Sequence, residues 1–220
     1  MAKMAVSLLD MDYANFKDSL AIIRSAGLDM AHLDVMDGQF VPNLGIGPKM
    51  IESLRKVTDL FFDVHLMVKD PERFIEKMAK AGADRITVHQ EACQDPARAM
   101  DLIRQAGVQA GICLRPETPL TVLDRHLLEK ADAVLLMTTV PGVEGVSFIP
   151  SSVEKIAALR ARIDLEGFPV RIETDGGIND NNLPMVIDAG ADEIVVGRSL
   201  VLGNMVENIK RLQAVMEGAA

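Results

Sequence analysis

The residues best suited to chemistry are a histidine and an aspartate, His32 and Asp34, which lie two positions apart in the apolar run 30–35. Because side chains of a β-strand alternate between its two faces, both should point the same way from one strand end. His65 lies at the end of a second apolar run, 61–66, and Asp175 follows a third, 170–174. Two imidazoles and two carboxylates, each at a strand end, predict one bound divalent cation and a pair of carboxylates for acid/base chemistry.

This prediction depends on the whole set, since a single buried histidine in a strand is usually structural. His89 ends another apolar run, and we expect it either beside the metal ligands or as a plain core residue. His126 falls in an expected exposed helix and is given no role. Two cysteines, Cys93 and Cys113, are too few for a disulfide framework, so we expect reduced thiols and a cytoplasmic protein.

Composition narrows the class of protein. The chain has 220 residues, of which 49% are hydrophobic, enough for a large core. No apolar run approaches the roughly 18 residues of a membrane span, and the N-terminus lacks the pattern of a signal peptide. The net charge of −9 argues against nucleic acid as a partner but not against a small anionic substrate, because a local site can be positive in an acidic protein.

Strand and helix patterns alternate along the chain. Proline favours the first turn of a helix, so helices are expected to begin at Pro71, Pro96 and Pro184. Glycine favours the position just after a helix, so helices are expected to end at Gly27, Gly82, Gly107 and Gly190. The apolar runs that predict strands lie at about 4–8, 30–35, 61–66, 85–89, 109–114, 133–138, 170–174 and 193–197.

A weak internal repeat supports a regular architecture. The tetrapeptide Ala-Gly-X-Asp precedes expected strands at 26–29, 81–84 and 189–192, with a degenerate copy at 130–133. Eight strands alternating with helices, without a linker, predict an α/β protein in which residues 1–220 form one (β/α)₈ TIM barrel domain. A doubly wound open sheet is the alternative; it would not easily bring together residues at the ends of the second, third and seventh strands.

Five motifs carry a resemblance to a known family over residues 7 to about 201: HLDVMDG at 32–38, FVPN at 40–43, DVHLM at 63–67, TVH at 87–89 and DGGI at 175–178. With them the chain resembles the ribulose-phosphate 3-epimerase family, which includes allulose-6-phosphate 3-epimerases. The resemblance implies a homo-oligomer such as a dimer or a hexamer. It also implies metal ligands at His32, Asp34, His65 and Asp175, a strand-end serine at Ser7, and active-site methionines at Met36, Met67 and Met137.

The chemistry implied by the resemblance requires these residue types. Epimerising a carbon next to a ketone means removing its proton and returning one on the other face, so two acid/base groups are needed. Asp34 and Asp175 would be those catalytic groups, facing each other across the substrate. A cation would stabilise the negative charge of the enediolate, and zinc, iron, manganese or cobalt all suit mixed nitrogen and oxygen ligands. The methionines would form a polarizable lid.

A phosphate group on the substrate would need its own contacts. Backbone N–H groups of late barrel loops commonly bind phosphate, although glycines also simply permit tight turns. We expect Arg198 either to bind phosphate directly or to pair with Glu144. The candidate glycines are Gly142, Gly145, Gly176, Gly177 and Gly197.

The chain departs from the family pattern near this predicted phosphate site, at Val140, Glu144, Val146, Arg115 and Arg198. We favour a 3-epimerase of a ketose phosphate, such as ribulose 5-phosphate/xylulose 5-phosphate or a related ketulose phosphate, because the loop glycines are kept. The alternatives are a non-phosphorylated or non-standard ketose, another barrel reaction on a phosphorylated substrate, and a non-catalytic sugar-phosphate binder. An aldolase would need a lysine at a strand end, and none is found there.

Overall fold

The strands close into a barrel in the computed structural model, which describes residues 2–143, 145 and 147–218. All pairs are parallel and follow chain order, and β1 pairs with β8 (Lys3 opposite Glu193), so the open-sheet alternative is excluded. Each predicted strand forms within one residue of its expected bounds. The strands are β1 (Lys3–Ser7), β2 (Met30–Met36), β3 (Phe61–Met67), β4 (Arg85–His89), β5 (Gln109–Leu114), β6 (Ala133–Met137), β7 (Arg171–Asp175) and β8 (Glu193–Val196).

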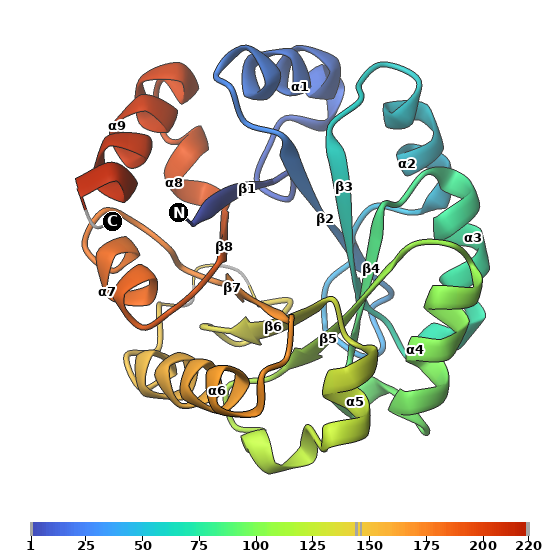
Figure 1. Cartoon of the computed structure of the whole chain (residues 1–220). Coiled ribbons are helices and arrows are strands. Elements are labelled where there is room, and N and C mark those ends of the chain that lie inside the picture. Colours follow the sequence, from blue (N-terminus) through green and yellow to red (C-terminus); the bar gives the residue numbers. More distant parts are fainter. Residues whose placement is uncertain (1, 144, 146, 219–220) are drawn as a thin grey trace.

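Helices surround the barrel (Figure 1). Between helices and strands lies a core of aliphatic side chains, which the alternation of each strand directs outward. The α-helices are α1 (Phe16–Ser25), α2 (Pro48–Arg55), α3 (Ile75–Ala81), α4 (Pro96–Gln105), α5 (Arg125–Lys130), α6 (Ser152–Glu166), α7 (Leu183–Asp188), α8 (Arg198–Val201) and α9 (Met205–Gly218). Short 3₁₀ helices are η1 (Tyr13–Asn15), η2 (Pro71–Arg73), η3 (Gln90–Ala92) and η4 (Leu120–Val122). None of the described helices is long and apolar enough to cross a membrane.

Prolines and glycines mark the helix ends, with one difference from expectation. Pro96 is the first residue of α4 and Pro184 the second of α7. Pro71 instead begins η2, because Phe74 N donates to the Pro71 carbonyl and closes a 3₁₀ turn before α3 starts. The four predicted C-terminal glycines all have positive φ. Gly82 has φ +113°, and a Cβ there would lie 2.7 Å from Cγ of Arg55.

The internal repeat has a structural role. In three copies the aspartate accepts a hydrogen bond from the second backbone amide of the preceding strand, and so clips two neighbouring strands together at their N-terminal ends. These clips join Asp84 to Phe62, Asp132 to Ala110 and Asp192 to Ile172, at 2.7, 2.8 and 2.8 Å. In the remaining copy Asp29 pairs instead with the Lys3 ammonium at 2.9 Å.

Strand register brings the chemical residues together. β2 pairs with β3 so that Asp34 lies opposite His65 and His32 opposite Asp63. Side chains at alternate positions of these strands point into the barrel. The interior is therefore charged rather than filled with branched aliphatic residues, as barrel interiors usually are. Buried polar and charged residues include His32, Asp34, Asp63, His65, Arg85, Thr87, His89, Glu173 and Glu193.

Candidate active site and metal centre

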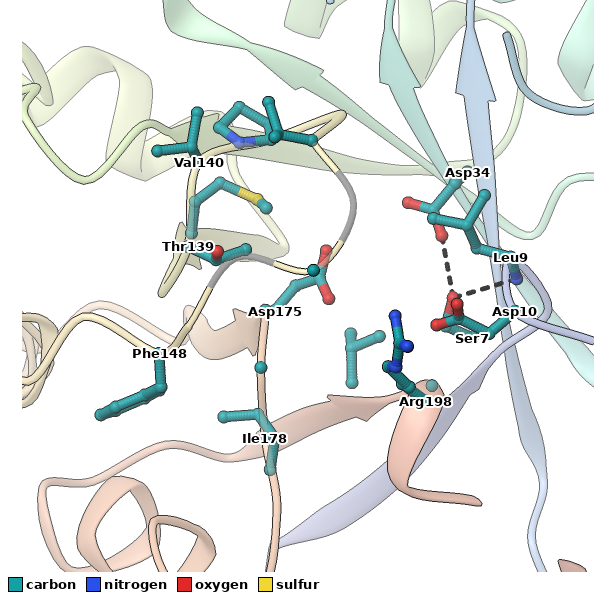
Figure 2. A pocket seen from close by; sticks show the side chains of 18 of the residues that line it. Ser7, Leu9, Asp10, Asp34, Thr139, Val140, Phe148, Asp175, Ile178 and Arg198 are labelled. Carbon is teal, nitrogen blue, oxygen red and sulfur yellow. Dashed lines mark hydrogen bonds between the residues drawn. The ribbon is translucent and has the colours of Figure 1, made fainter. Parts of the chain in front are cut away.

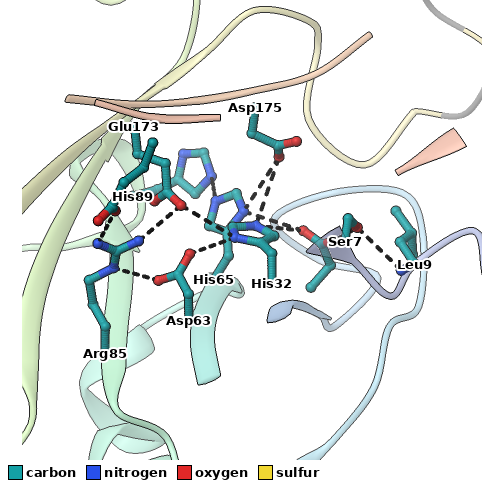
Figure 3. A network of polar contacts seen from close by, with 11 residues as sticks. Ser7, Leu9, His32, Asp63, His65, Arg85, His89, Glu173 and Asp175 are labelled. Atoms are coloured by element: carbon teal, nitrogen blue, oxygen red, sulfur yellow. Dashed lines mark hydrogen bonds and ion pairs between the residues drawn. The ribbon is translucent and has the colours of Figure 1, made fainter. Parts of the chain in front are cut away.

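The four predicted metal ligands lie on β2, β3 and β7 and converge on one position inside the barrel; His32 lies in the middle of β2 rather than at the expected strand end. Figure 3 shows His32, His65 and Asp175 directed toward one another. His32 Nε2 and His65 Nδ1 each lie 3.4 Å from the same Asp34 oxygen, Oδ1. Both nitrogens lie 4.0 Å from Oδ2 of Asp175. Ligand bonds of about 2.1 Å in tetrahedral geometry separate donor atoms by about 3.4 Å. The spacing therefore suits a single divalent cation.

Hydrogen bonding leaves the inward nitrogens free. His32 Nε2 and His65 Nδ1 are buried and have no hydrogen-bond partner among the described residues. The outer nitrogens are both engaged: His32 Nδ1 lies 2.6 Å from Oδ2 of Asp63, and His65 Nε2 lies 2.9 Å from Nε2 of His89. A buried polar atom without a partner is costly. Two such lone pairs aimed at two carboxylates fit a metal ion.

The surrounding charge also attracts a cation. Burial lowers the pKa of His32, but the carboxylates of Asp34 and Asp63 outweigh burial and raise that pKa well above its ordinary value. A proton and a metal ion compete for the same imidazole lone pair. An environment that favours positive charge at His32 Nε2 therefore favours a divalent cation in that position as well.

The two carboxylates differ in their affinity for a proton. Burial raises the pKa of Asp34, but the neighbouring His32 and His65 outweigh it and hold the pKa well below its ordinary value. Burial and the charge of Asp34 raise the pKa of Asp175 to about 6. The side chains themselves thus keep Asp34 ionised and let Asp175 take up a proton just below neutral pH, and a bound cation would lower both pKa values. Such a difference suits paired base and acid roles.

Ser7 orients Asp34. The Ser7 hydroxyl donates to Oδ2 of Asp34 at 2.9 Å and accepts a hydrogen bond from the backbone N–H of Leu9 at 3.2 Å. Oδ1 is left for the two imidazoles. Ser7, at the end of β1, thus gives the two oxygens of Asp34 different partners: Oδ2 accepts from the serine, and Oδ1 faces the two imidazoles.

A cavity of about 470 Å³ opens beside these residues, at the C-terminal ends of the strands (Figure 2). Asp34 and Asp175 both line it. Of the predicted substrate-binding residues, those that line it are Ser7, Met67, Met137, Gly142, Gly145, Gly176, Gly177, Gly197 and Arg198. Met36 is not among the described lining residues; its side chain is buried in a cluster with Val41 and Met67.

Arg198 is the first residue of α8, and its exposed side chain lines the cavity. Figure 2 shows its guanidinium pointing into the cavity, which Ser7, Asp10 and Asp175 also line. The backbone at Gly197 passes close by, since a Cβ there would lie 3.3 Å from Oδ2 of Asp10. Val140 also lines the cavity. Glu144 and Val146 lie outside the described residues, so the expected pairing of Arg198 with Glu144 stays a prediction.

Some of the candidate glycines also have a structural reason to be glycine. Gly176 has φ +123°, and a Cβ there would lie 2.2 Å from Cγ2 of Thr139. At Gly142 a Cβ would lie 2.3 Å from Cβ of Val41. Both backbones pack too closely for any side chain. Both glycines also line the cavity, so a packing role does not exclude contact between their backbone and a substrate.

Arg115 contacts protein rather than lining the cavity. Its Nη2 donates to the Phe40 carbonyl at 3.2 Å, and its guanidinium carbon lies 4.3 Å from the centroid of the Phe40 ring. The Arg115 backbone N–H donates to Glu91 at 2.9 Å. This departure from the family pattern therefore affects packing around Phe40 rather than the lining of the cavity.

A buried ion network below the site was not predicted from the sequence. Arg85, fully buried, lies 2.6 Å from Asp63, 2.9 Å from Glu173 and 2.5 Å from Glu193. Arg85 helps keep the pKa of Asp63 well below its ordinary value despite burial, whereas burial raises that of Glu173. Asp63 and Glu173 stand two residues before His65 and Asp175 respectively, so the period-2 spacing already indicated inward-facing charge.

Comparison with known proteins agrees with these findings. The model of the ribulose-phosphate 3 epimerase family matches residues 3–201. The chain is 45% identical over 201 residues to ribulose-phosphate 3-epimerase of Bacillus subtilis (strain 168), covering 91% of this chain and 92% of that protein. It is 43% identical over 197 residues to ribulose-phosphate 3-epimerase of Escherichia coli (strain K12), covering 89% and 87%.

Solved structures share the barrel at low identity. The 3-hexulose-6-phosphate synthase from Salmonella typhimurium superposes with a TM-score of 0.75 at 17% identity, covering 99% of this chain and all (100%) of that one. The 3-keto-L-gulonate-6-phosphate decarboxylase from Vibrio cholerae superposes with a TM-score of 0.73 at 14% identity, covering 100% and 99%. These structural likenesses establish the fold alone. The family match over residues 3–201 and the 45% identity to a member show that the chain belongs to the ribulose-phosphate 3-epimerase family.

Proposed function

We propose that the chain is a metal-dependent 3-epimerase of a ketose phosphate, such as ribulose 5-phosphate/xylulose 5-phosphate or a related ketulose phosphate. The observation that carries the proposal is the convergence of Asp34 and Asp175, from non-adjacent strands, on one point at the cavity wall beside two free imidazole nitrogens. Membership of the family and the names of the relatives support the same reaction.

The chain's own side chains account for the proton transfers. Asp34, ionised and oriented by Ser7, takes the C3 proton from one epimer. The electron pair of the broken C–H bond moves toward the C2 carbonyl and gives an enediolate. Asp175, whose raised pKa favours a proton, returns one to the opposite face of C3. The roles of the two carboxyls reverse in the other direction.

We propose His32, Asp34, His65 and Asp175 as the residues that hold the divalent cation. Bound there, a cation supplies Lewis-acid stabilisation of negative charge on oxygen. Zinc, iron, manganese and cobalt remain the candidates. A homo-oligomeric state and a cytoplasmic location also stay predictions from the sequence and its resemblance.

Solvent-deuterium exchange at C3 tests the function directly. A panel of ketose phosphates and the matching free ketoses is incubated with the enzyme in D₂O and followed by NMR. Deuterium should enter C3 of at least one ketose phosphate, at a rate comparable to epimerisation, because each turnover passes through a carboxyl that exchanges with solvent. Exchange confined to free ketoses would transfer the proposal to a non-phosphorylated substrate, and no exchange at all would refute epimerase chemistry.

Arg198→Ser tests the phosphate end of the cavity. We expect KM for the phosphorylated substrate to rise roughly tenfold or more, because a charged hydrogen bond is worth about 1.5–3 kcal/mol and about 1.4 kcal/mol is tenfold in affinity. The turnover number kcat should fall less, since the phosphate is remote from C3. Steady-state kinetics measure both, with Arg198→Lys as the charge-preserving control.

Free ketoses supply the second control for Arg198. An equal rise in KM for a non-phosphorylated ketose would mean that Arg198 holds α8 in place rather than the phosphate. An unchanged KM for the phosphorylated substrate would contradict the contact altogether.

A further inference from the structure

The two imidazoles face the metal position through different ring nitrogens. His32 presents Nε2 and His65 presents Nδ1 (Figure 3). A neutral imidazole carries one proton, and the nitrogen that binds a metal must be the one without it. His32 therefore needs its proton on Nδ1, and His65 needs its proton on Nε2. The groups behind each ring must select opposite tautomers.

Behind His32 the selection is direct. Asp63 lies 2.6 Å from His32 Nδ1 and is held on its other oxygen by Arg85 at 2.6 Å. An ionised carboxylate only accepts hydrogen bonds. The proton of His32 is therefore fixed on Nδ1, which leaves Nε2 free.

Behind His65 the neighbour is ambiguous. Nε2 of His65 lies 2.9 Å from Nε2 of His89, and an imidazole nitrogen can either donate or accept. The pair by itself allows both directions of the hydrogen bond. A third group has to decide which nitrogen of His89 carries the proton.

Glu91 is that group. Its Oε2 lies 3.2 Å from Nδ1 of His89. Its Oε1 accepts hydrogen bonds from the Arg115 backbone N–H at 2.9 Å and from the Thr118 hydroxyl. Two donors on Oε1 favour the ionised form of Glu91, and an ionised carboxylate only accepts hydrogen bonds. His89 must then donate from Nδ1 and accept at Nε2, so that His65 donates from Nε2 and keeps Nδ1 free.

The surroundings hold the three groups in place. The rings of His65 and His89 are stacked, with centroids 4.9 Å apart, and the Phe40 ring lies 4.8 Å from that of His89. The loop 115–118 supplies the donors to Glu91. Lys155 fixes this loop, because its ammonium donates to the carbonyls of Arg115 and Thr118 at 2.7 and 2.6 Å. Neither histidine is exposed, so water does not compete for the hydrogen bond between them.

We propose that Glu91, acting through His89, sets the tautomer of His65, so that both are positioning residues of the metal centre. The inference rests on the proposed function for the role of His65 as a ligand, but the direction of the hydrogen bonds follows from Glu91, His89 and His65 alone. Partners behind a ligating histidine typically change metal affinity about 10–100-fold.

Glu91→Gln is the first test, with Glu117→Gln as the matched control that removes a carboxylate from an exposed position of the loop 115–118, which hydrogen-bonds to Glu91. Two-bond ¹H–¹⁵N correlation of the metal-free, ¹⁵N-histidine-labelled protein at alkaline pH reports each ring's tautomer. We expect His65 to be protonated on Nε2 in the wild type and in Glu117→Gln, and to become a mixture in Glu91→Gln. Competition titration with zinc should show an affinity about 10–100-fold weaker in Glu91→Gln alone.

Substitutions of His89 keep the test decisive if Glu91→Gln fails to fold. The carbonyl of a glutamine can accept from His65 Nε2, so His89→Gln should keep most of the zinc affinity. His89→Leu has no acceptor and should lose it. Equal affinities of these two variants, or an unchanged His65 tautomer in Glu91→Gln, would overturn the proposal.

The outcomes separate this inference from the proposed function. A wild-type chain that binds no zinc and exchanges no proton refutes the function, while the tautomer measurement on the metal-free protein still stands. A wild-type chain that binds zinc and turns over, with Glu91→Gln behaving identically, refutes the relay alone. Weaker zinc binding by Glu91→Gln with the wild-type tautomer would also refute it, since the carboxylate would then act through its charge.

Discussion

Asp175→Asn is expected to lower epimerisation about 10²–10⁴-fold, the range typical of a lost general acid or base. The asparagine amide keeps the size and the hydrogen-bonding oxygen of the side chain but cannot carry the C3 proton. Asp34→Asn should cause a loss of the same order, with weakened metal binding as well, because Asp34 Oδ1 faces both imidazoles. Steady-state rates and metal content of both variants measure these effects.

An isotope signature distinguishes a lost base from a damaged site. Because each aspartate serves one face of C3, either variant should still exchange the C3 proton of one epimer with D₂O while failing to interconvert the two. Ser7→Ala is the matched control: it removes the hydrogen bond to Asp34 but no titratable group, so both exchange reactions should persist at a reduced rate. Near-normal turnover by either Asn variant would rule out the two-base mechanism.

Removing the metal is expected to abolish turnover while the barrel stays folded. The four proposed ligands are fixed by paired strands and a packed core, so far-UV circular dichroism should not change after chelation. Thermal stability should fall by about 5–11 °C: a ligand at a hundred times its Kd contributes about 2.7 kcal/mol, and each kcal/mol is about 2–4 °C for a domain of this size. Calorimetry measures the shift.

Elemental analysis and re-addition of metal complete this test. We expect one divalent ion per chain in active enzyme and recovery of activity on adding one equivalent of zinc, iron, manganese or cobalt to the chelated protein. His126→Gln is a suitable control, since His126 lies exposed on α5, away from the ligands. Full activity without stoichiometric metal would contradict the assigned centre.

Local patterns in the sequence predict most of the fold. Strand positions follow from apolar runs, and the barrel follows from their alternation with helices. The grouping of His32 and Asp34 follows from period-2 geometry, and their meeting with His65 and Asp175 follows from barrel closure. Each of these inferences uses neighbours in sequence or the common direction of parallel strands.

Contacts that depend on the choice of distant partners could not be predicted in this way. Arg85 meets Glu193, which lies 108 positions away, and the sequence shows the charges without showing which of them pair. Met36 has the same inward phase as Asp34 but packs with Val41 and Met67, because the segment after β2 folds over it. Arg115 is one of the departures from the family pattern near the predicted phosphate site, but its guanidinium packs on the Phe40 ring. These outcomes depend on side-chain packing, which has no local signature.

The aspartate clips bear on how the chain finds this fold. Each clip joins groups that are near in sequence: the separation is 22 positions for Asp84, 22 for Asp132 and 20 for Asp192. Contacts between near neighbours in sequence form with little loss of chain entropy and accompany fast folding. A break in the chain at Gly107 would leave the Asp84 clip wholly in the first half and the other two in the second. The barrel is thus suited to assembly from pre-formed strand pairs, with the β1–β8 seam closing last.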